Sequence, residues 1–227
     1  MRTSRRPRFA WLAVILVLIV TSTACGGPTA DPLPSWREGD ARAAIVSFVE
    51  RTTNEGSPDF VPASQRIAVF DNDGCLWPEN PIPFQLAFAV DEINRLVTEQ
   101  PALKEDPMVA ALLAGDTAKL LAGPRHEGLL RIIALTHAGM TTDEFSARVQ
   151  DWIGSAEHPR FKRPYDQLTY QPMQEVLRYL RDNGFMTFIV SGGGADFMRA
   201  WSERVYGIPP EQVVGSTGRV TYEVRDT

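Results

Sequence analysis

Two short, largely apolar runs, each followed at once by a polar or glycine-rich turn, place the strongest limits on the fold of this chain. Residues 67–70 (IAVF) lead into the turn DNDG, and residues 185–190 (FMTFIV) lead into the turn SGGG. Continuous apolar runs of this length are typical of strands that are covered on both faces of a parallel sheet. The sequence therefore predicts an α/β fold in which two parallel strands end in chemically distinctive loops.

Helical segments surround the two predicted strands. Residues 40–54 have amphipathic periodicity, and residues 172–183 carry a proline in the first turn and stop at Gly184. Residues 195–206 form a further predicted helix that stops at Gly207. Strands and helices in this order indicate right-handed crossovers, so the predicted core is a Rossmann-like parallel sheet with helices on both faces.

The segment between the two strands carries helical patterns and almost no strand signal. Asp106 stands before Pro107 as a start signal, and Thr141 stands three residues before Glu144 in the pattern of a capping box. The predicted helices of this segment span residues 84–100, 106–122, 127–137 and 142–156.

A connection this long is more than a plain crossover between two strands. We predict an all-helical cap, residues 77–165, inserted just after the first strand, where it can lie over the ends of the strands. The α/β core is then made of residues 39–76 and 166–227, with no internal repeat in either part.

The N-terminal segment has the organisation of a secretory signal peptide. Arginines in residues 1–8 precede an uncharged apolar run over residues 9–20 and a stretch of small residues over 21–27. The apolar run is short for a bilayer-spanning helix, and an uncleaved anchor is the alternative. Residues 1–24 are therefore predicted to be a signal peptide, and residues 25–38, rich in proline and glycine, a flexible tether.

Ala24-Cys25-Gly26 resembles the lipobox of bacterial lipoproteins, in which the cysteine becomes the lipidated first residue of the mature chain. Ser22 departs from that pattern, because the position three before the cysteine is usually aliphatic. The resemblance implies lipidation of Cys25 and an exported protein that is anchored to the cell membrane or lies in the periplasmic or extracytoplasmic space. Cys75 is the other cysteine, and no disulfide is expected between the two.

Composition excludes two classes of protein. The chain has 227 residues, of which 44% are hydrophobic, and a net charge of -5, with basic residues grouped only at the N-terminus. Binding of nucleic acid through a charged surface is therefore not expected. The mean hydropathy of -0.17 excludes a multi-span membrane protein. Removal of residues 1–24 takes away four arginines and no acid, which leaves a more acidic chain.

Side chains suited to phosphate chemistry gather at the ends of the two strands. Asp71 and Asp73 are two residues apart in an extended segment, so their carboxylates project on one side at the carboxyl edge of the sheet. Two close carboxylates favour a hard divalent cation such as Mg²⁺. Ser191 and the glycines after it lead into a predicted helix and offer a hydroxyl, free N–H groups and the positive end of a helix dipole. This pattern predicts a phosphate site.

Together the two segments resemble the motifs of a known family. Residues 70–77 (FDNDGCLW) look like the first motif of the haloacid dehalogenase-like hydrolases, and residues 188–193 (FIVSGG) look like their second. The helical insertion lies where the phosphoserine-phosphatase-like branch of that superfamily carries its cap. The resemblance covers residues 40–227.

The resemblance implies a role for each matching residue. Asp71 would be the nucleophile that attacks phosphorus and becomes an aspartyl phosphate, and Asp73 the acid and base that protonates the leaving alcohol and then activates water. The Ser191 hydroxyl and the Gly192 N–H would hold the phosphoryl oxygens. Mg²⁺ would be bound by the Asp71 carboxylate and the Asp73 main-chain carbonyl. The implied activity is magnesium-dependent hydrolysis of a small phosphate monoester.

Two departures from the family pattern matter. Cys75 stands where the family usually has threonine, which is a tolerable change. The family's third-motif lysine and fourth-motif acidic pair have no counterpart, because no lysine follows Ser191 and no acidic pair ends a predicted strand there. Residues 219–224 alternate like a strand before the sequence stops. This pattern favours a C-terminally truncated member with impaired activity, with a degenerate protein as the alternative.

The same features leave two further functions open. A surface lipoprotein that binds a phosphorylated ligand without turnover would explain the missing lysine and acidic pair. Another hydrolase or phosphotransferase of the same superfamily is also possible on this scaffold, although Asp73 argues against a dehalogenase. The remaining candidates are interpreted as core or surface residues: His126, His137, His158, Trp77, Phe84, Phe88, Arg125, Arg160, Lys162 and Arg163.

Overall fold

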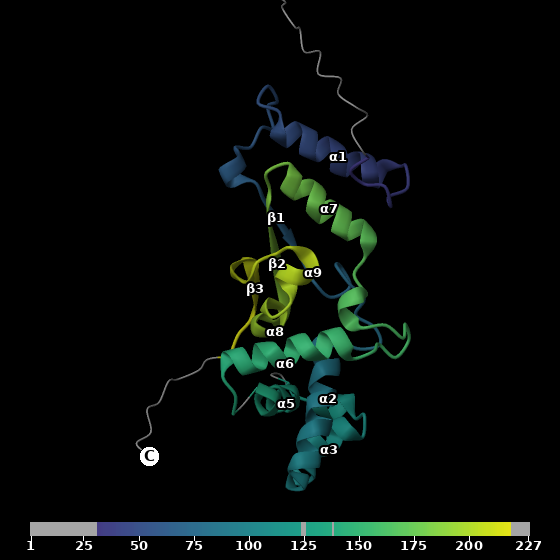
Figure 1. Cartoon of the computed structure of the whole chain (residues 1–227), viewed down its shortest axis with the longest axis vertical. Coiled ribbons are helices and arrows are strands. Elements are labelled where there is room, and N and C mark those ends of the chain that lie inside the picture. Colours follow the sequence, from purple (N-terminus) through teal and green to yellow (C-terminus); the bar gives the residue numbers. More distant parts are fainter. Residues whose placement is uncertain (1–30, 124–125, 138, 219–227) are drawn as a thin grey trace, which may run out of the picture. The chain divides into compact units, whose positions relative to one another are not determined.

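A three-stranded parallel sheet holds the two predicted strands side by side (Figure 1). The computed structural model describes residues 31–218 with the exception of 124, 125 and 138. The strand order is β1 (Ile67–Phe70), β2 (Met186–Gly194) and β3 (Val213–Ser216). Phe70 pairs with Ile189, and Ile189 pairs with Val213. The carboxyl ends of the strands therefore meet at one edge, as the two apolar runs predict.

Helices make up most of the rest of the described structure, and no strand interrupts the described part of the segment between β1 and β2. The α/β fold with a long helical insertion is thus confirmed. The helices are α1 (Asp40–Thr53), α2 (Phe84–Glu99), α3 (Pro107–Leu113), α4 (Thr117–Leu120), α5 (Glu127–His137), α6 (Thr142–Ser155), α7 (Gln171–Asp182), α8 (Ala195–Arg199) and α9 (Ser202–Tyr206).

Local capping explains where several helices begin and end. The Thr141 hydroxyl accepts from the Glu144 N–H while the Glu144 carboxylate accepts from the Thr141 N–H, so the predicted capping box at the start of α6 is confirmed. The predicted helix over 106–122 is wrong in one respect. Gly115 adopts a φ of 71°, in the left-handed region, and Asp116 caps a new helix, so α3 and α4 are separate.

Two further predictions at the second strand need correction. The helix expected over 195–206 is interrupted, because Trp201 leaves the helical conformation and the chain restarts as α9. The loop expected over 191–194 instead continues β2 as far as Gly194, with a register shift between Val190 and Gly194. Strand β3 was not predicted.

The helices α1 and α7 pack together against one face of the sheet. Ala68 and Phe70 of β1 contact a cluster that contains Val49 of α1 and Val176 and Leu180 of α7. Part of the predicted tether belongs to this layer, which corrects the expectation of a flexible segment over residues 25–38. The described segment includes Leu33, which is fully buried, and Ser35 and Trp36, whose side chains donate to the Glu175 carboxylate and the Pro172 carbonyl at 2.6 and 3.0 Å.

Helices were expected on both faces of the sheet, but the described helices cover only one. On the other face, large exposed apolar side chains alternate with less exposed residues along β1, and further ones lie on β2 and β3. β1 is also an edge strand in the described sheet. The exposed residues of this open face are Ile67, Val69, Met186, Val190 and Val214, at 56%, 58%, 39%, 44% and 52% exposure.

We expect the open face to drive self-association of the purified chain, because an apolar sheet face beside an unpaired edge strand attracts other chains. Replacing Val69 with lysine puts a charge at a position that is 58% exposed. Light scattering should show less association for Val69→Lys than for the wild type, with a similar urea midpoint. The control Ile189→Lys, at a fully buried position, should instead unfold the chain. Equal association of wild type and Val69→Lys would show that this face is not responsible.

The inserted helices have a core of their own and also contact the sheet layer. Ile93 of α2, Val109 of α3 and Ile132 of α5 belong to one buried cluster. A second cluster joins α2 and α6 to α8 through aromatic contacts, in which Phe88 lies 5.5 Å from Trp152 and 5.6 Å from Phe197 between ring centroids. The insertion is therefore packed against the end of the sheet that carries the strand-end loops.

The predicted signal peptide over residues 1–24 and the predicted lipidation site Cys25 lie outside the described residues, as does the alternating segment 219–224. Within the described part of the chain, every helix is too short or too polar to cross a membrane.

Candidate active site

Side chains of the loop after β1 differ in how deeply they are buried. Asn72 is buried, whereas Asp71 on one side is exposed and Asp73 on the other is partly buried. The Asn72 carbonyl accepts from the N–H groups of Cys75 and Leu76 at 3.2 and 2.9 Å, which closes a tight turn. Asn72 thus anchors the loop in the core, and this alternation leaves the two flanking carboxylates nearer the surface.

Asp71 stands at the carboxyl end of β1 with one described hydrogen bond, in which its Oδ1 accepts from the Asn72 N–H at 2.7 Å. The rest of the carboxylate is available to a ligand. The Cys75 thiol lies close enough to interact with it, and burial together with the charge of Asp71 raises the pKa of this thiol. Cys75 therefore stays protonated at neutral pH.

Asp73 is held from the core side by an aromatic residue. The Trp77 Nε1–H donates to Asp73 Oδ1 at 2.6 Å, and the Asn72 amide approaches the same oxygen at 3.4 Å. Burial raises the pKa of the Asp73 carboxyl, the hydrogen bond from Trp77 opposes that rise, and the nearby charges of Asp71 and Glu79 add to it. A carboxyl with a raised pKa retains a proton more readily, which suits a general acid.

Ser191 and Gly192 lie at the end of β2, beside the end of β1. Because Phe70 pairs with Ile189, the residues that follow each of them leave adjacent parallel strands at the same edge. The Ser191 hydroxyl accepts from the Gly193 N–H at 3.2 Å, and the space beside the Gly192 Cα is open. The structure therefore brings the two aspartates and the serine turn to one edge of the sheet.

The helix after this turn contributes less than the sequence predicts. α8 contains only 5 residues, so the predicted role of a helix dipole at the phosphate site loses its support. The turn is instead held by its neighbours: the Gly194 N–H donates to Gln85 Oε1 at 2.7 Å, and the Ser216 hydroxyl donates to the Gly192 carbonyl at 2.9 Å. Sequence reasoning missed Gln85, because nothing in the pattern of α2 links it to β2.

The donors present suit Mg²⁺ chemically. The Asp71 carboxylate and the Asp73 main-chain carbonyl are hard oxygen ligands, and Mg²⁺ is commonly bound by one or two carboxylates while it keeps several waters. Among the described residues no group of three or more histidine, cysteine, aspartate or glutamate side chains could hold a metal ion.

Of the other candidates from the sequence, Trp77 reaches this site through its hydrogen bond to Asp73. Trp77, Phe84 and Phe88 are fully buried core residues, and His158 is buried with its Nε2 against the Asn80 carbonyl at 3.0 Å. Arg163 lines a shallow pocket of about 210 Å³ together with Pro78, Phe161, Gln167, Leu168, Thr169 and Tyr170.

The family is decided by the match to a family model. The model of the haloacid dehalogenase-like hydrolases matches residues 68–226, which include both strand-end loops. The chain belongs to this family. The two motifs by which the sequence resembles haloacid dehalogenase-like hydrolases therefore lie at the ends of adjacent strands in a member of that family.

Comparison with individual proteins adds nothing to the family assignment. Among solved structures, a phosphoserine phosphohydrolase-like protein from Francisella tularensis subsp. tularensis SCHU S4 is 19% identical to this chain, with a TM-score of 0.33. The match covers 66% of this chain and 58% of that one, so this chain corresponds to less than two thirds of the other protein's length. No curated protein matches.

Proposed function

We propose that this haloacid dehalogenase-like hydrolase cleaves small phosphate monoesters with Asp71 as the nucleophile. The observation that carries the proposal is the meeting of two strand ends. β1 leads into the loop that carries Asp71 and Asp73, and the parallel neighbour β2 reaches Ser191 at the same edge. This arrangement supports the proposed roles of Asp71 as nucleophile, Asp73 as acid and Ser191 as phosphate-binding hydroxyl.

The reaction takes place in two displacements. In the first, an Asp71 carboxylate oxygen bonds to phosphorus, the bond from phosphorus to the ester oxygen breaks, and Asp73 gives its proton to that oxygen, so an alcohol leaves. In the second, Asp73 takes a proton from water, the water oxygen bonds to phosphorus, and the bond to Asp71 breaks. Inorganic phosphate is released and both carboxyl groups return to their starting state.

Negative charge on the phosphoryl oxygens needs stabilisation in both displacements. The Ser191 hydroxyl and the Gly192 N–H are proposed to donate to these oxygens. Mg²⁺ held by the Asp71 carboxylate and the Asp73 carbonyl would offset the repulsion between the nucleophile and the anionic ester. Oxyanion-type stabilisation by one such donor is worth on the order of 3 kcal/mol in other enzymes.

The proposal is tested by incubating the full chain with phenyl phosphate and 4-nitrophenyl phosphate in the presence of millimolar Mg²⁺. We expect phosphate release above the buffer blank, with saturation in the ester. Excess EDTA should abolish release and added Mg²⁺ should restore it. Absence of release at long incubation from folded protein would reject the proposed hydrolysis.

A second candidate function is binding of a phosphorylated ligand without turnover. It requires only that the Ser191 hydroxyl and the Gly192 N–H, which lie beside the end of β1, hold the phosphoryl oxygens. Calorimetry with phenyl phosphate separates the two functions, because saturable heat without phosphate release would support the binding protein. Release of halide from a haloacid, measured alongside, would instead indicate a dehalogenase.

We further propose that the protein is exported and lipid-anchored through Cys25. The proposal is supported by the arginine-rich start, the apolar run and the sequence Ala24-Cys25-Gly26. Metabolic labelling with palmitate in a bacterial host should label the wild type but not Cys25→Ser. Equal labelling of the two would reject Cys25 as the attachment site.

A further inference from the structure

The two oxygens of the Asp73 carboxyl have different surroundings. Oδ1 receives the Trp77 Nε1–H at 2.6 Å and the longer contact from Asn72 Nδ2 at 3.4 Å. Within the described residues, Oδ2 receives no hydrogen bond. One oxygen is therefore tied to the core, and the other is left for a ligand.

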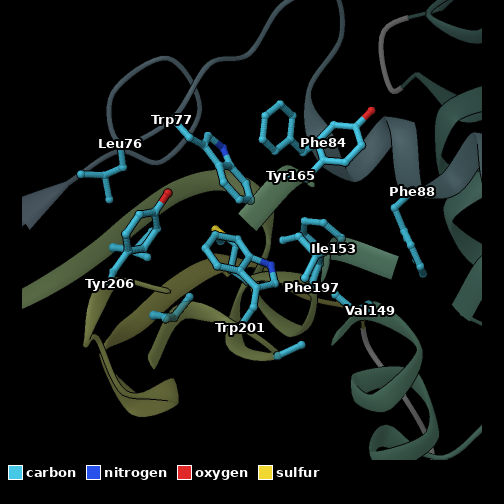
Figure 2. Close-up of a cluster of buried hydrophobic side chains, with 14 of the residues drawn as sticks. Leu76, Trp77, Phe84, Phe88, Val149, Ile153, Tyr165, Phe197, Trp201 and Tyr206 are labelled. Carbon is cyan, nitrogen blue, oxygen red and sulfur yellow. The ribbon is translucent and has the colours of Figure 1, made fainter. Parts of the chain in front are cut away.

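The Trp77 donor is held in a fixed direction. Its side chain is fully buried, stacked on Trp201 with ring centroids 4.3 Å apart and 30° between the planes, and it lies 4.3 Å from the ring of Phe84 (Figure 2). The Trp77 carbonyl also accepts from the Gly74 N–H at 2.9 Å, which ties the tryptophan backbone to the aspartate loop. The indole cannot turn away from Asp73 without breaking this packing.

The orientation of Asn72 is fixed from the same side. The buried Tyr206 hydroxyl donates to Asn72 Oδ1 at 3.3 Å, which leaves the amide nitrogen of Asn72 directed to Asp73. Figure 2 shows this hydroxyl pointing toward the loop that carries Leu76 and Trp77. Core side chains therefore present only donors to Asp73 Oδ1.

We propose that Trp77 is a positioning residue that holds Asp73 Oδ1, so that Oδ2 is the oxygen that gives its proton to the leaving group. This inference rests on the proposed phosphomonoester hydrolysis. An indole N–H can donate but cannot accept, so a proton on Oδ1 would oppose the Trp77 donor. The proton that Asp73 transfers is thus confined to Oδ2, and the carboxyl needs no rotation before it acts.

The neighbouring Trp201 provides a matched control. It is as buried as Trp77, at 1% exposure, and belongs to the same ring stack, but its Nε1–H has no hydrogen-bond partner among the described residues. Replacing either tryptophan with phenylalanine removes a comparable ring from the same cluster. Only the change at Trp77 also removes a donor to Asp73.

The hydrogen bond itself is tested by the indole ¹H–¹⁵N spectrum of the full chain, which contains five tryptophans. The resonance that disappears in Trp77→Phe should lie downfield of the one that disappears in Trp201→Phe. In Asp73→Leu the Trp77 resonance should move upfield by about 1 ppm or more, while that of Trp201 stays in place. A Trp77 resonance that is unchanged in Asp73→Leu would overturn the inference, whether or not the chain is active.

The positioning role is tested by comparing two esters of similar shape. Phenolate is a poorer leaving group than 4-nitrophenolate and depends more on a proton from Asp73. Trp77→Phe should lower kcat about tenfold for phenyl phosphate and no more than about threefold for 4-nitrophenyl phosphate, with little change in KM. Trp201→Phe should lower kcat equally for both esters, and by no more than about twofold.

The outcomes separate the inference from the proposed function. An equal loss with both esters in Trp77→Phe would show a purely structural role for Trp77 and overturn the inference alone. Failure of the wild type to hydrolyse either ester would reject the proposed function and the positioning role with it. A loss that is larger for phenyl phosphate in both tryptophan variants would show general damage to the cluster and would also overturn the inference.

Discussion

Replacing Asp71 with asparagine is expected to remove nearly all phosphate-ester turnover while leaving the fold intact. A carboxamide has no anionic oxygen to attack phosphorus, and loss of such a nucleophile costs on the order of 10⁴-fold or more in other enzymes. Asp71 is exposed, and its one described hydrogen bond, from the Asn72 N–H, can also be accepted by an asparagine side-chain oxygen. Phosphate release from 4-nitrophenyl phosphate should therefore nearly disappear in Asp71→Asn, whereas the urea midpoint should stay close to that of the wild type.

A matched control for Asp71→Asn is Asp59→Asn, which removes the same charge at an exposed ion pair with Arg51. This control should keep wild-type turnover, because exposed pairs of this kind contribute little. Turnover in Asp71→Asn that remains comparable to that of the wild type would reject Asp71 as the nucleophile.

Replacing Gly215 with alanine is expected to destabilise the chain by about 1–3 kcal/mol. A Cβ at this position in β3 would lie 2.6 Å from the Gly193 carbonyl oxygen and 2.9 Å from the Ala195 nitrogen, which are both main-chain atoms. Main-chain atoms cannot move aside as a flexible side chain can, so β3 must shift away from the turn that follows Val190. We expect a lower urea midpoint and, because Gly192 belongs to this turn, weaker binding of phosphate esters.

The control for Gly215→Ala is Gly218→Ala, just beyond the end of β3, where an added Cβ meets no atom within 4 Å. Its free energy of unfolding in urea should match that of the wild type within about 0.5 kcal/mol. Equal urea midpoints of the two alanine variants would show that a Cβ is tolerated at position 215 despite the close approach of β3 to residues 193–195.

Prediction from sequence succeeded where residues close together in the sequence decide the local structure. The apolar run over 67–70 forms β1, and the capping pattern at Thr141 begins α6. The motif residues Asp71 and Ser191 reach the same edge of the sheet, because parallel strands place their carboxyl ends together. Their roles in catalysis stay predictions.

Prediction failed where neighbours distant in sequence decide the structure. β3 is only 4 residues long and owes its place to pairing with β2. Residues 191–194 continue β2 rather than forming a loop, and they are contacted by Gln85 of α2 and Ser216 of β3. Neither contact can be predicted from the local pattern of apolar and polar residues.

The sequence by itself determined the first two strands, most of the helices around them, the resemblance to the hydrolase family and the residues that carry its motifs. These depend on local periodicity, capping and short motifs, which are all patterns among residues close together in the sequence. Only the tertiary structure decided which core residues hold Asp73: Trp77 follows it by four residues and reads as an ordinary core aromatic, and Tyr206 reaches Asn72 across 134 positions. The physical reason is that a buried donor acts through the direction of its N–H or O–H, and packing against distant side chains sets that direction.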